Sequence, residues 1–392
     1  MNVHFINVQK ILQQLFFPLN FTCLISIFAL YMATLHKEFI PNPYTKTLTA
    51  GETTWRSPSN IALVKYWGKH GQQLPKNTSI SFTLDNCATQ TRLEYQIAQN
   101  NEPTLKVLLD GKEEPGFLPK IQKFFNIAGP YIPFLGECDL VVHTTNSFPH
   151  SSGIASSASG MSALALCLLD IENSLMDTPH SSEFYNKKAS FLARLGSGSA
   201  ARSIDGGLVV WGQHSKIDGS SDLYAVAYPE AVHPVFHDFC DTILLVDKGQ
   251  KVVSSTVGHG LMHNHPFAEQ RFQQANSNME HIKPILASGD LKAFIALVES
   301  EALSLHAMML TSSPYFVLMK PATLEIINRI WAFRQETDTP LCFTLDAGAN
   351  VHLLYPKNTA ETVRAFIETS LKPFCKDGAY IHDNVGAGAI RL

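Results

Sequence analysis

The spacing of hydrophobic and polar residues divides the chain into a mixed half and a half rich in helices. In the first half, period-two alternation and short apolar runs predict strands at residues 80–84, 91–97, 105–109, 138–144 and 206–212. Apolar residues spaced three and four apart predict helices at residues 119–128, 156–169 and 182–195. Residues 36–54 are polar and carry no clear period, so we expect them to be loosely packed.

The second half begins near Asp238 with an apolar run, DTILLVDK, that predicts a buried strand. Helical spacing follows at residues 266–286, 290–309, 321–336 and 360–371, and β-like runs occur at 340–348, 351–356 and 379–392. This order predicts an α+β fold with two lobes. We place a mixed α/β lobe at residues 51–237 and a lobe with a ferredoxin-like antiparallel sheet at 238–392.

The segment NSFPHSSGIASSASG, residues 146–160, contains six serines and two glycines between a predicted strand and a predicted helix. Backbone N–H groups and hydroxyls of such a loop can close on an anion, and a helix N-terminus adds the positive end of its dipole. Gly153 lacks the Cβ that would hold a phosphate away. We interpret the segment as a phosphate-binding loop, although it has no Walker pattern. The alternative is a serine-rich surface loop with an ordinary helix cap.

Lys65 lies inside an apolar run, SPSNIALVKYWGKHG at residues 57–71, and Lys69 follows four residues later. A buried lysine is costly unless it is paired or faces a ligand. Asn60 and Tyr66 add further polar groups to the same run. We therefore favour a functional lysine, and the alternative is a solvated edge strand on which lysine prevents pairing with other chains.

Two further segments place polar residues beside small ones. In LGSGSAARSIDGG, residues 195–207, Ser199 and Arg202 can share one face of a helix start, where a guanidinium fork suits a carboxylate or phosphate. In FTLDAGANVHLL, residues 343–354, Asp346 follows an apolar strand, a position that often carries catalytic groups. The alternatives are a capped helix with an exposed arginine and an Asp-x-Gly turn.

These segments together supply an anion-binding loop, two lysines, one arginine and one carboxylate. Metal-assisted phosphoryl transfer to a small anionic substrate needs such groups. Cations and loop N–H groups stabilise the charge that spreads in the transition state, and a carboxylate can orient a hydroxyl and accept its proton. The residues therefore predict a kinase-like reaction class without identifying a substrate.

Composition argues against several other classes of protein. Hydrophobic residues make up 45% and charged residues 16% of the 392 residues, which indicates a globular chain long enough for two lobes. The net charge is -4 and no Lys/Arg block occurs, so we expect no nucleic-acid partner. Seven widely spaced cysteines without a CxxC pair indicate reduced thiols and a cytoplasmic protein. The 16 histidines show no spacing typical of zinc ligands.

The segment Phe16–Leu35 is nearly apolar and differs from the rest of the chain. It can be read as a membrane anchor, an export signal, or sequence upstream of the true start near Met32. Pro18 and Asn20 weaken it as a membrane span, and no clear cleavage site follows. We favour the third interpretation, in which residues 1–50 are an extension outside the two lobes and no membrane partner is expected.

Six segments in this order resemble motifs of the diphosphomevalonate decarboxylase (mevalonate diphosphate decarboxylase) family, within the GHMP kinase superfamily. The resemblance covers about residues 55–392. Its segments are SPSNIALVKYWGK, PKNTSIS, NSFPHSSGIASSASG, GSGSAARS, SSTVG and TLDAGAN. The family fold is the two-lobed GHMP arrangement, often as a homodimer, and residues 1–50 have no counterpart in it.

The resemblance implies a reaction of the mevalonate pathway of isoprenoid biosynthesis, a branch of lipid metabolism. ATP phosphorylates the tertiary 3-hydroxyl of mevalonate 5-diphosphate, phosphate then leaves, and loss of CO2 gives isopentenyl diphosphate. Asp346 corresponds to the catalytic aspartate at the 3-hydroxyl, and Lys65 to a lysine near the reacting groups. Arg202 corresponds to the arginine that holds the C1 carboxylate, and Asn60 to an asparagine that positions this arginine.

The resemblance also implies two binding sets, with ATP and Mg²⁺ as cofactors. The residues expected around the substrate diphosphate, besides Arg202, are Tyr66, Lys69, Ser197, Ser199 and Ser255. The residues expected around ATP are Asn146, Pro149, Ser151, Ser152, Gly153, Ala155, Ser156 and Ser157. Among these, Ser157 is the expected contact to the metal ion.

The chain departs from the family motifs at a few positions, and two other functions stay open. His150, Ser151 and Ser152 replace Thr-Ala-Ala, Ser147 replaces a second Asn, Ala201 replaces Cys and Ala349 replaces Pro. One rival is a sister GHMP enzyme that acts on mevalonate 5-phosphate or on mevalonate. The other is a non-catalytic nucleotide-binding or membrane-tethered scaffold, which only the apolar N-terminal segment favours.

Overall fold

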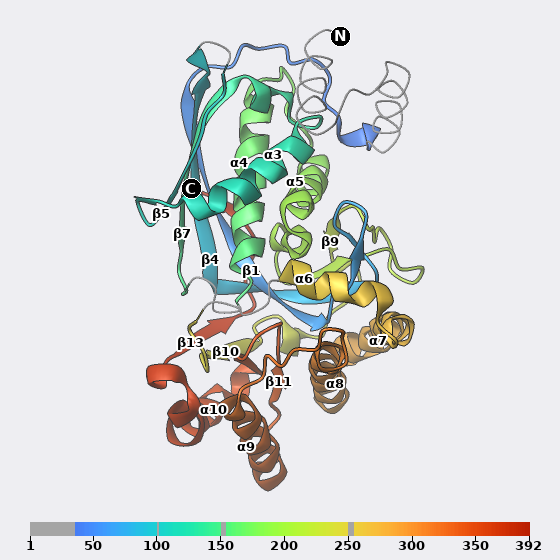
Figure 1. Cartoon of the computed structure of the whole chain (residues 1–392). Coiled ribbons are helices and arrows are strands. Elements are labelled where there is room, and N and C mark those ends of the chain that lie inside the picture. Colours follow the sequence, from blue (N-terminus) through green and yellow to red (C-terminus); the bar gives the residue numbers. More distant parts are fainter. Residues whose placement is uncertain (1–35, 100–101, 150–153, 250–254) are drawn as a thin grey trace.

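The computed structural model describes residues 36–99, 102–149, 154–249 and 255–392 and shows a two-lobed α+β molecule (Figure 1). The larger lobe contains an eight-stranded sheet, and the smaller lobe contains a four-stranded one. Helices α3, α4 and α5 cover one face of the larger sheet (Figure 1). The apolar N-terminal segment and Met32 lie outside the described residues.

The larger sheet is built mostly from the first part of the chain. Its central path runs β14-β1-β4-β7-β5-β6, and β8 and β9 extend it from β4. Its strands are β1 (Gly51–Val64), β4 (Ser79–Ile97), β5 (Leu105–Leu109), β6 (Lys112–Glu113), β7 (Cys138–Asn146), β8 (Leu208–Trp211), β9 (Ala225–Ala227) and β14 (Ile390–Arg391). The helices against it are α3 (Leu118–Ala128), α4 (Ser156–Ser174) and α5 (Ser182–Gly196). Helix α4 is apolar on nearly all sides because it is buried between the sheet and α5.

The smaller sheet has the order β11-β12-β10-β13, with all of its strand pairs antiparallel. Its strands are β10 (Cys240–Leu244), β11 (Cys342–Thr344), β12 (Val351–Tyr355) and β13 (Tyr380–Asn384). Its helices are α6 (Ser255–Gly260), α7 (Ala268–Ser288), α8 (Leu291–Leu310), α9 (Pro321–Thr337) and α10 (Ala360–Phe366). This order and connectivity are those of a ferredoxin-like sheet, so the predicted fold class is confirmed.

One apolar core joins the two sheets. Ile61 and Phe82 of the larger sheet share a buried cluster with Ile243 and Leu354 of the smaller one. The chain also returns to its first sheet, because β14 pairs with β1 although its residues lie in the range predicted for the second lobe. The two lobes are therefore closely packed at their junction.

Two local predictions were wrong. Residues 36–54 are not loose, because Phe39 is buried and stacks on Phe191 at 4.2 Å between ring centroids. The separate strands predicted at 80–84 and 91–97 form one strand, β4, which pairs with β1 along most of its length. A register shift between Pro58 and Asn60 lets the pair bend without breaking.

Helix α8 is the one helix in the described part of the chain that is long and apolar enough to cross a membrane. Half of its most apolar window is buried inside the protein. It also carries Glu299, Glu301 and His306 as buried polar residues. This burial and these polar residues are typical of a core helix of a globular protein.

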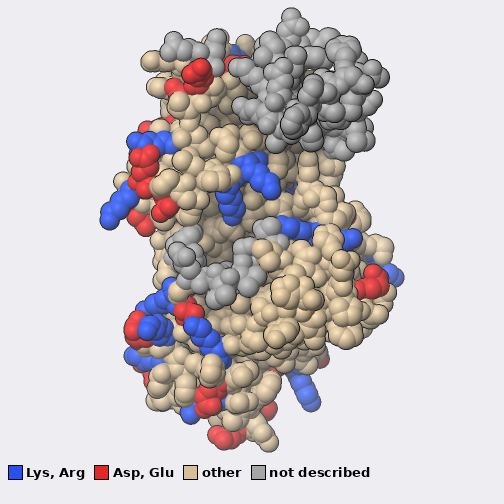
Figure 2. Space-filling view, in the orientation of Figure 1, with Lys and Arg blue, Asp and Glu red and all other residues tan. Residues whose placement is uncertain are grey.

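Charged side chains of both signs are interspersed on the face of the molecule in Figure 2. Much of that face carries neither sign, in keeping with the 16% charged residues of the chain. The described residues on this face form no continuous basic surface.

Candidate active site

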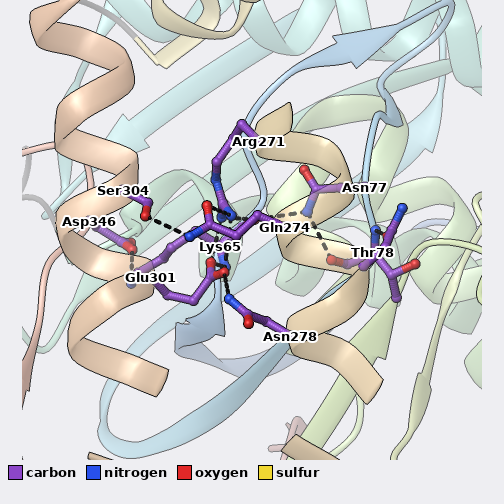
Figure 3. Close-up of polar contacts among 10 residues, drawn as sticks. Lys65, Asn77, Thr78, Arg271, Gln274, Asn278, Glu301, Ser304 and Asp346 are labelled. Carbon is purple, nitrogen blue, oxygen red and sulfur yellow. Dashed lines mark hydrogen bonds and ion pairs between the residues drawn. The ribbon is translucent and has the colours of Figure 1, made fainter. Parts of the chain in front are cut away.

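Lys65 and Asp346 meet at the junction of the two lobes. Lys65 follows the last residue of β1, and Asp346 follows the end of β11 in the other lobe. The Lys65 Nζ lies 3.1 Å from Asp346 Oδ1, with side-chain exposures of 1% and 28% (Figure 3). The lysine is enclosed while its partner reaches solvent, which rules out the alternative of a solvated edge strand.

Burial lowers the pKa of Lys65, and the charge of Asp346 opposes this shift. The backbone of Asp346 is held as well, because its carbonyl oxygen lies 3.1 Å from His306 Nε2. Burial lowers the pKa of His306 to about 4, so its ring is neutral near pH 7 and donates from Nε2. Asp346 is thus held by Lys65 of the larger lobe and by His306 of the smaller lobe.

Arg202 lies on a short 3-10 helix, η5 (Gly198–Ser203), and its side chain is buried beneath the same junction. Its Nε donates to Asn60 Oδ1 at 3.3 Å, and its Nη1 donates to Ser79 Oγ. Asn60 in turn donates to Ser203 Oγ at 2.8 Å and to the carbonyl of Ser199 at 3.2 Å. The predicted Asn60–Arg202 contact is therefore present.

Burial lowers the pKa of Arg202 to about 10, so it stays a cation at neutral pH. The negative charge of Asp346 opposes this shift more than any other group does, so the charges of Arg202 and Asp346 lie close enough to interact. The guanidinium also lies over the ring of Trp211, 5.8 Å from the centroid. The exposed-arginine alternative is wrong, because the side chain is enclosed on several sides.

The predicted phosphate-binding loop leads into the N-terminus of α4, as expected. Ala155 caps this helix in the left-handed region, with φ of 47°. The hydroxyl of Ser157 lies 3.3 Å from that of Ser197, so the loop meets the segment expected to bind the substrate. Ser156, Ser157 and Asn146 line a pocket between α3, α4 and β7 that Lys120 also borders. Ser151, Ser152 and Gly153 lie outside the described residues, and Pro149 is exposed beside them.

Lys69 and Tyr66 lie on the chain beyond Lys65. Lys69, on the short hairpin β2 (Lys69–His70) and β3 (Leu74–Pro75), donates to Gln73 Oε1 at 2.8 Å, and burial lowers its pKa. A Cβ at Gly198 would lie 2.8 Å from the Tyr66 hydroxyl, so only glycine permits this approach of η5. The Ser255 backbone begins α6, and its side chain lies outside the described set.

The described residues contain no cluster of three His, Cys, Asp or Glu side chains suited to a metal ion. The Ser157 hydroxyl at the start of α4 fits a cation whose other ligands come from phosphate oxygens. Mg²⁺ is usually held in this way, with few protein ligands and substrate phosphates. The donor set thus fits a metal that arrives with a nucleotide.

Several contacts were missed in the sequence. Glu301 and Arg271 hold the backbone of Lys65, and Ser79 holds Arg202. The run LKAFIALVESEALSLHAMML offered a signal for the first, because Glu301 interrupts an otherwise apolar helix face. Ser79 lies within PKNTSIS, one of the six segments that carry the family resemblance, although its contact with Arg202 was not predicted. No comparable signal marked Arg271, which lies 206 residues from Lys65.

Two family models match the chain. One describes the diphosphomevalonate decarboxylase-like N-terminal domain and covers residues 57–225. The other describes the mevalonate 5-diphosphate decarboxylase C-terminal domain and covers residues 242–386. Together they span both lobes.

Individual proteins agree with these models. The diphosphomevalonate decarboxylase of Saccharomyces cerevisiae is 30% identical over 345 residues, which cover 83% of this chain and 81% of the yeast protein. The mevalonate diphosphate decarboxylase of Staphylococcus aureus matches with TM-score 0.75 and 27% identity over 88% of this chain and 98% of its own. A complex of MDDEF with MVAPP, AMPPCP and magnesium also has TM-score 0.75, with 26% identity over 88% of this chain and 99% of its own.

Proposed function

The chain belongs to the diphosphomevalonate decarboxylase family, and on that premise we propose that it decarboxylates mevalonate 5-diphosphate with ATP. The products are isopentenyl diphosphate, ADP, phosphate and CO2. The observation that carries the proposal is the Lys65–Asp346 pair at the lobe junction, with the buried Arg202 fork beside it. The family supplies the substrate, and these residues supply the groups that its reaction needs.

The chemistry begins at the 3-hydroxyl of the substrate. Asp346 orients this hydroxyl and accepts its proton while the oxygen takes the γ-phosphoryl group of ATP. The C3–O bond then breaks and phosphate leaves. The electrons of the C1–C2 bond form the new C2–C3 double bond, and C1 departs as CO2.

Two cations have distinct tasks in this scheme. Lys65, 3.1 Å from Asp346, stabilises negative charge on the carboxylate and on the transferring group. Arg202 offers a planar fork that suits the C1 carboxylate, and Asn60 and Ser79 fix its orientation. Because Asn60 acts through the arginine, we assign it a positioning role.

The phosphate groups have two candidate binding regions. ATP fits the pocket at the N-terminus of α4, where loop N–H groups and the helix dipole favour anions. Mg²⁺, when bound beside Ser157, neutralises charge on the β- and γ-phosphates. The substrate diphosphate fits the region of Lys69, Tyr66 and Ser197, with Ser199 and Ser255 as further candidates.

We also propose a cytoplasmic location and a homodimer. The described cysteines are all free and buried, as suits a reducing compartment. Exposed apolar side chains at Leu310, Tyr315 and Val317 offer a surface for self-association. Light scattering of the purified chain tests the dimer, and a monomer across the working concentration range would contradict it.

ATP-dependent CO2 release by the purified full chain tests the proposed reaction. The assay compares mevalonate 5-diphosphate, mevalonate 5-phosphate and mevalonate, with ADP measured in parallel. We expect equal amounts of CO2 and ADP from the diphosphate alone. ADP without CO2, or a preference for another substrate, would keep the fold and assign the chain to a sister enzyme; no turnover of any kind would favour a scaffold.

A further inference from the structure

The backbone of Lys65 is held by side chains on both sides of the residue (Figure 3). Its N–H donates to Glu301 Oε2 at 2.8 Å. Its carbonyl accepts from Asn77 Nδ2 at 2.9 Å and from Arg271 Nη2 at 3.4 Å. Since Val64 is the last residue of β1 paired with β4, side chains here take the place of a strand partner.

Glu301 is itself fixed in a buried network. It is fully buried on α8 and forms a two-pronged ion pair with Arg271 of α7. Asn278 Nδ2 donates to the same carboxylate at 2.6 Å. With four donors on two oxygens, the carboxylate has one orientation, and that orientation fixes the peptide before Lys65.

We propose that Glu301, Arg271 and Asn77 are positioning residues that hold Lys65 at the distance from Asp346 that phosphoryl transfer requires. We call these three side chains the Lys65 clamp. The clamp rests on the proposed function, because Lys65 matters only if it serves the reacting groups. Two members lie on helices of the smaller lobe, so the clamp ties a residue of the first lobe to the second.

The clamp also has an electrostatic role. Burial lowers the pKa of Lys65, and Asp346 and then Glu301 oppose that shift. The other charged or titratable groups that act on Lys65 or respond to it are Arg202 of η5, Arg271 of α7, His306 of α8 and Asp241 of β10. Removing the Glu301 charge must therefore lower the pKa of Lys65 further, so that the lysine loses its proton at lower pH.

The test is Glu301→Gln in the full chain, with ATP, Mg²⁺ and mevalonate 5-diphosphate. We expect kcat to fall about 10–100-fold, the order of loss that a 1 Å misplacement causes. KM for both substrates should change less than about threefold, because no substrate-binding group is removed. The alkaline limb of the kcat–pH profile should move to lower pH, which a loss of stability alone would not cause.

Glu172→Gln is the matched control. Glu172 is also fully buried and paired, with Lys188 Nζ at 2.7 Å, but it lies on α4 and its partner on α5, both in the larger lobe. This variant removes a buried carboxylate of the same kind and should lower thermal stability while leaving kcat and its pH profile unchanged. The comparison separates the cost of a broken buried ion pair from an effect on Lys65.

Asn77→Ala is a second variant that leaves the Glu301–Arg271 ion pair intact. Asn77 carries no charge, so this variant changes the position of Lys65 without changing the charges around it. It also tests the clamp if Glu301→Gln does not fold. We expect a loss of roughly fivefold in kcat, which corresponds to one lost hydrogen bond.

The outcomes separate the clamp from the proposed function. An unchanged kcat in both variants, or a kcat loss equal to that of Glu172→Gln with no shift of the alkaline limb, would overturn the clamp. A wild-type chain that releases no CO2 from mevalonate 5-diphosphate would instead overturn the proposed function, and the clamp would fall with it.

Discussion

At the scale of single residues, the two members of the Lys65–Asp346 pair differ strongly in exposure. The lysine is 1% exposed and the aspartate 28%, so the carboxylate reaches solvent while the lysine does not. An ion pair on a solvated surface contributes little, whereas one with an enclosed partner is oriented by its surroundings. The pair therefore presents a carboxylate in a fixed direction.

Asp346→Asn should keep ATP binding and lower kcat by about 10²–10⁴, the usual contribution of a positioned base. The amide cannot accept the hydroxyl proton, although it keeps the shape of the side chain. Rapid-quench assays with mevalonate 5-diphosphate measure kcat, and titration with a fluorescent ATP analogue measures binding. Asp377→Asn, at an exposed ion pair with Lys248, is the control. A variant with near-normal turnover would remove Asp346 from the mechanism.

Arg202→Lys keeps the positive charge and loses the planar fork. A lysine cannot donate to Asn60 and Ser79 while also holding a carboxylate in two-pronged geometry. We expect kcat/KM for mevalonate 5-diphosphate to fall about 10–100-fold, as for a lost charge-assisted hydrogen bond. Steady-state kinetics checks this, with KM for ATP as the internal control. Unchanged kcat/KM would show that this fork does not hold the substrate carboxylate.

At the scale of elements, α8 supplies buried polar contacts to both partners of the pair. Glu301 on this helix accepts from the Lys65 backbone, and His306 contacts the carbonyl of Asp346. The helix also buries Glu299, which pairs with Arg334 of α9, and it packs against α7, β1 and β11. One core helix thus fixes two residues that come from different lobes.

His306→Gln should make the stability of the protein less dependent on pH. The folded-state pKa of His306 is about 4, below the value of 6.5 for a free histidine, because burial disfavours its charge. Between these values the unfolded chain binds more protons, so the stability of the wild type falls as pH drops from 6.5 to 4, by up to about 3 kcal/mol.

Chemical denaturation across this pH range measures the effect, and the variant should lose less stability than the wild type as the pH falls. His237→Gln, at an exposed position, is the control and should leave the pH dependence unchanged. A variant with the same pH dependence as the wild type would mean that His306 does not titrate between these limits.

The sequence predicted most elements because their periods are strong. The predicted helix at 182–195 and strand at 105–109 agree closely with α5 and β5. The prediction of two strands within residues 80–97 was wrong. The polar pair Asp85-Asn86 resembles a turn, but it is an exposed part of the single strand β4. The register with β1 is interrupted between Thr83 and Ala88, and the N–H groups of residues 85–87 donate to the Asp383 carboxylate, a contact that no local pattern records.

The same limit applies to the site. Lys65 was predicted as a functional lysine because it places a charge inside an apolar run, whereas Asp346 could also be an Asp-x-Gly turn until the family resemblance implied a role for it. Lys65 and Asp346 lie 281 residues apart, so no local pattern predicts that they are in contact. Only the family resemblance indicated that both lie near the reacting groups. Arg271 gave no signal, because an arginine in a polar amphipathic helix is ordinary until its burial is known.

At the scale of the whole molecule, the proposed active site depends on how the lobes are joined. Lys65 belongs to the first lobe and Asp346 to the second, so their 3.1 Å contact spans the junction. The turn after β13 helps to fix this junction, since Gly386 donates to the Thr83 carbonyl at 2.9 Å and accepts from the Gly207 N–H at 2.9 Å. A change in this turn should therefore alter both stability and turnover.

Gly386→Ala tests this coupling. An added Cβ would lie 2.5 Å from the Leu84 carbonyl oxygen and 2.7 Å from the Asp85 Cα, and backbone atoms cannot easily move aside. We expect the free energy of unfolding to fall by about 1–3 kcal/mol, as for other overpacked sites, and kcat to fall with it. Gly260→Ala is the control, because its Cβ would meet nothing within 4 Å. Denaturant titration and CO2 release report the two quantities. Loss of stability with full kcat would show that the turn supports folding without setting the distance between Lys65 and Asp346.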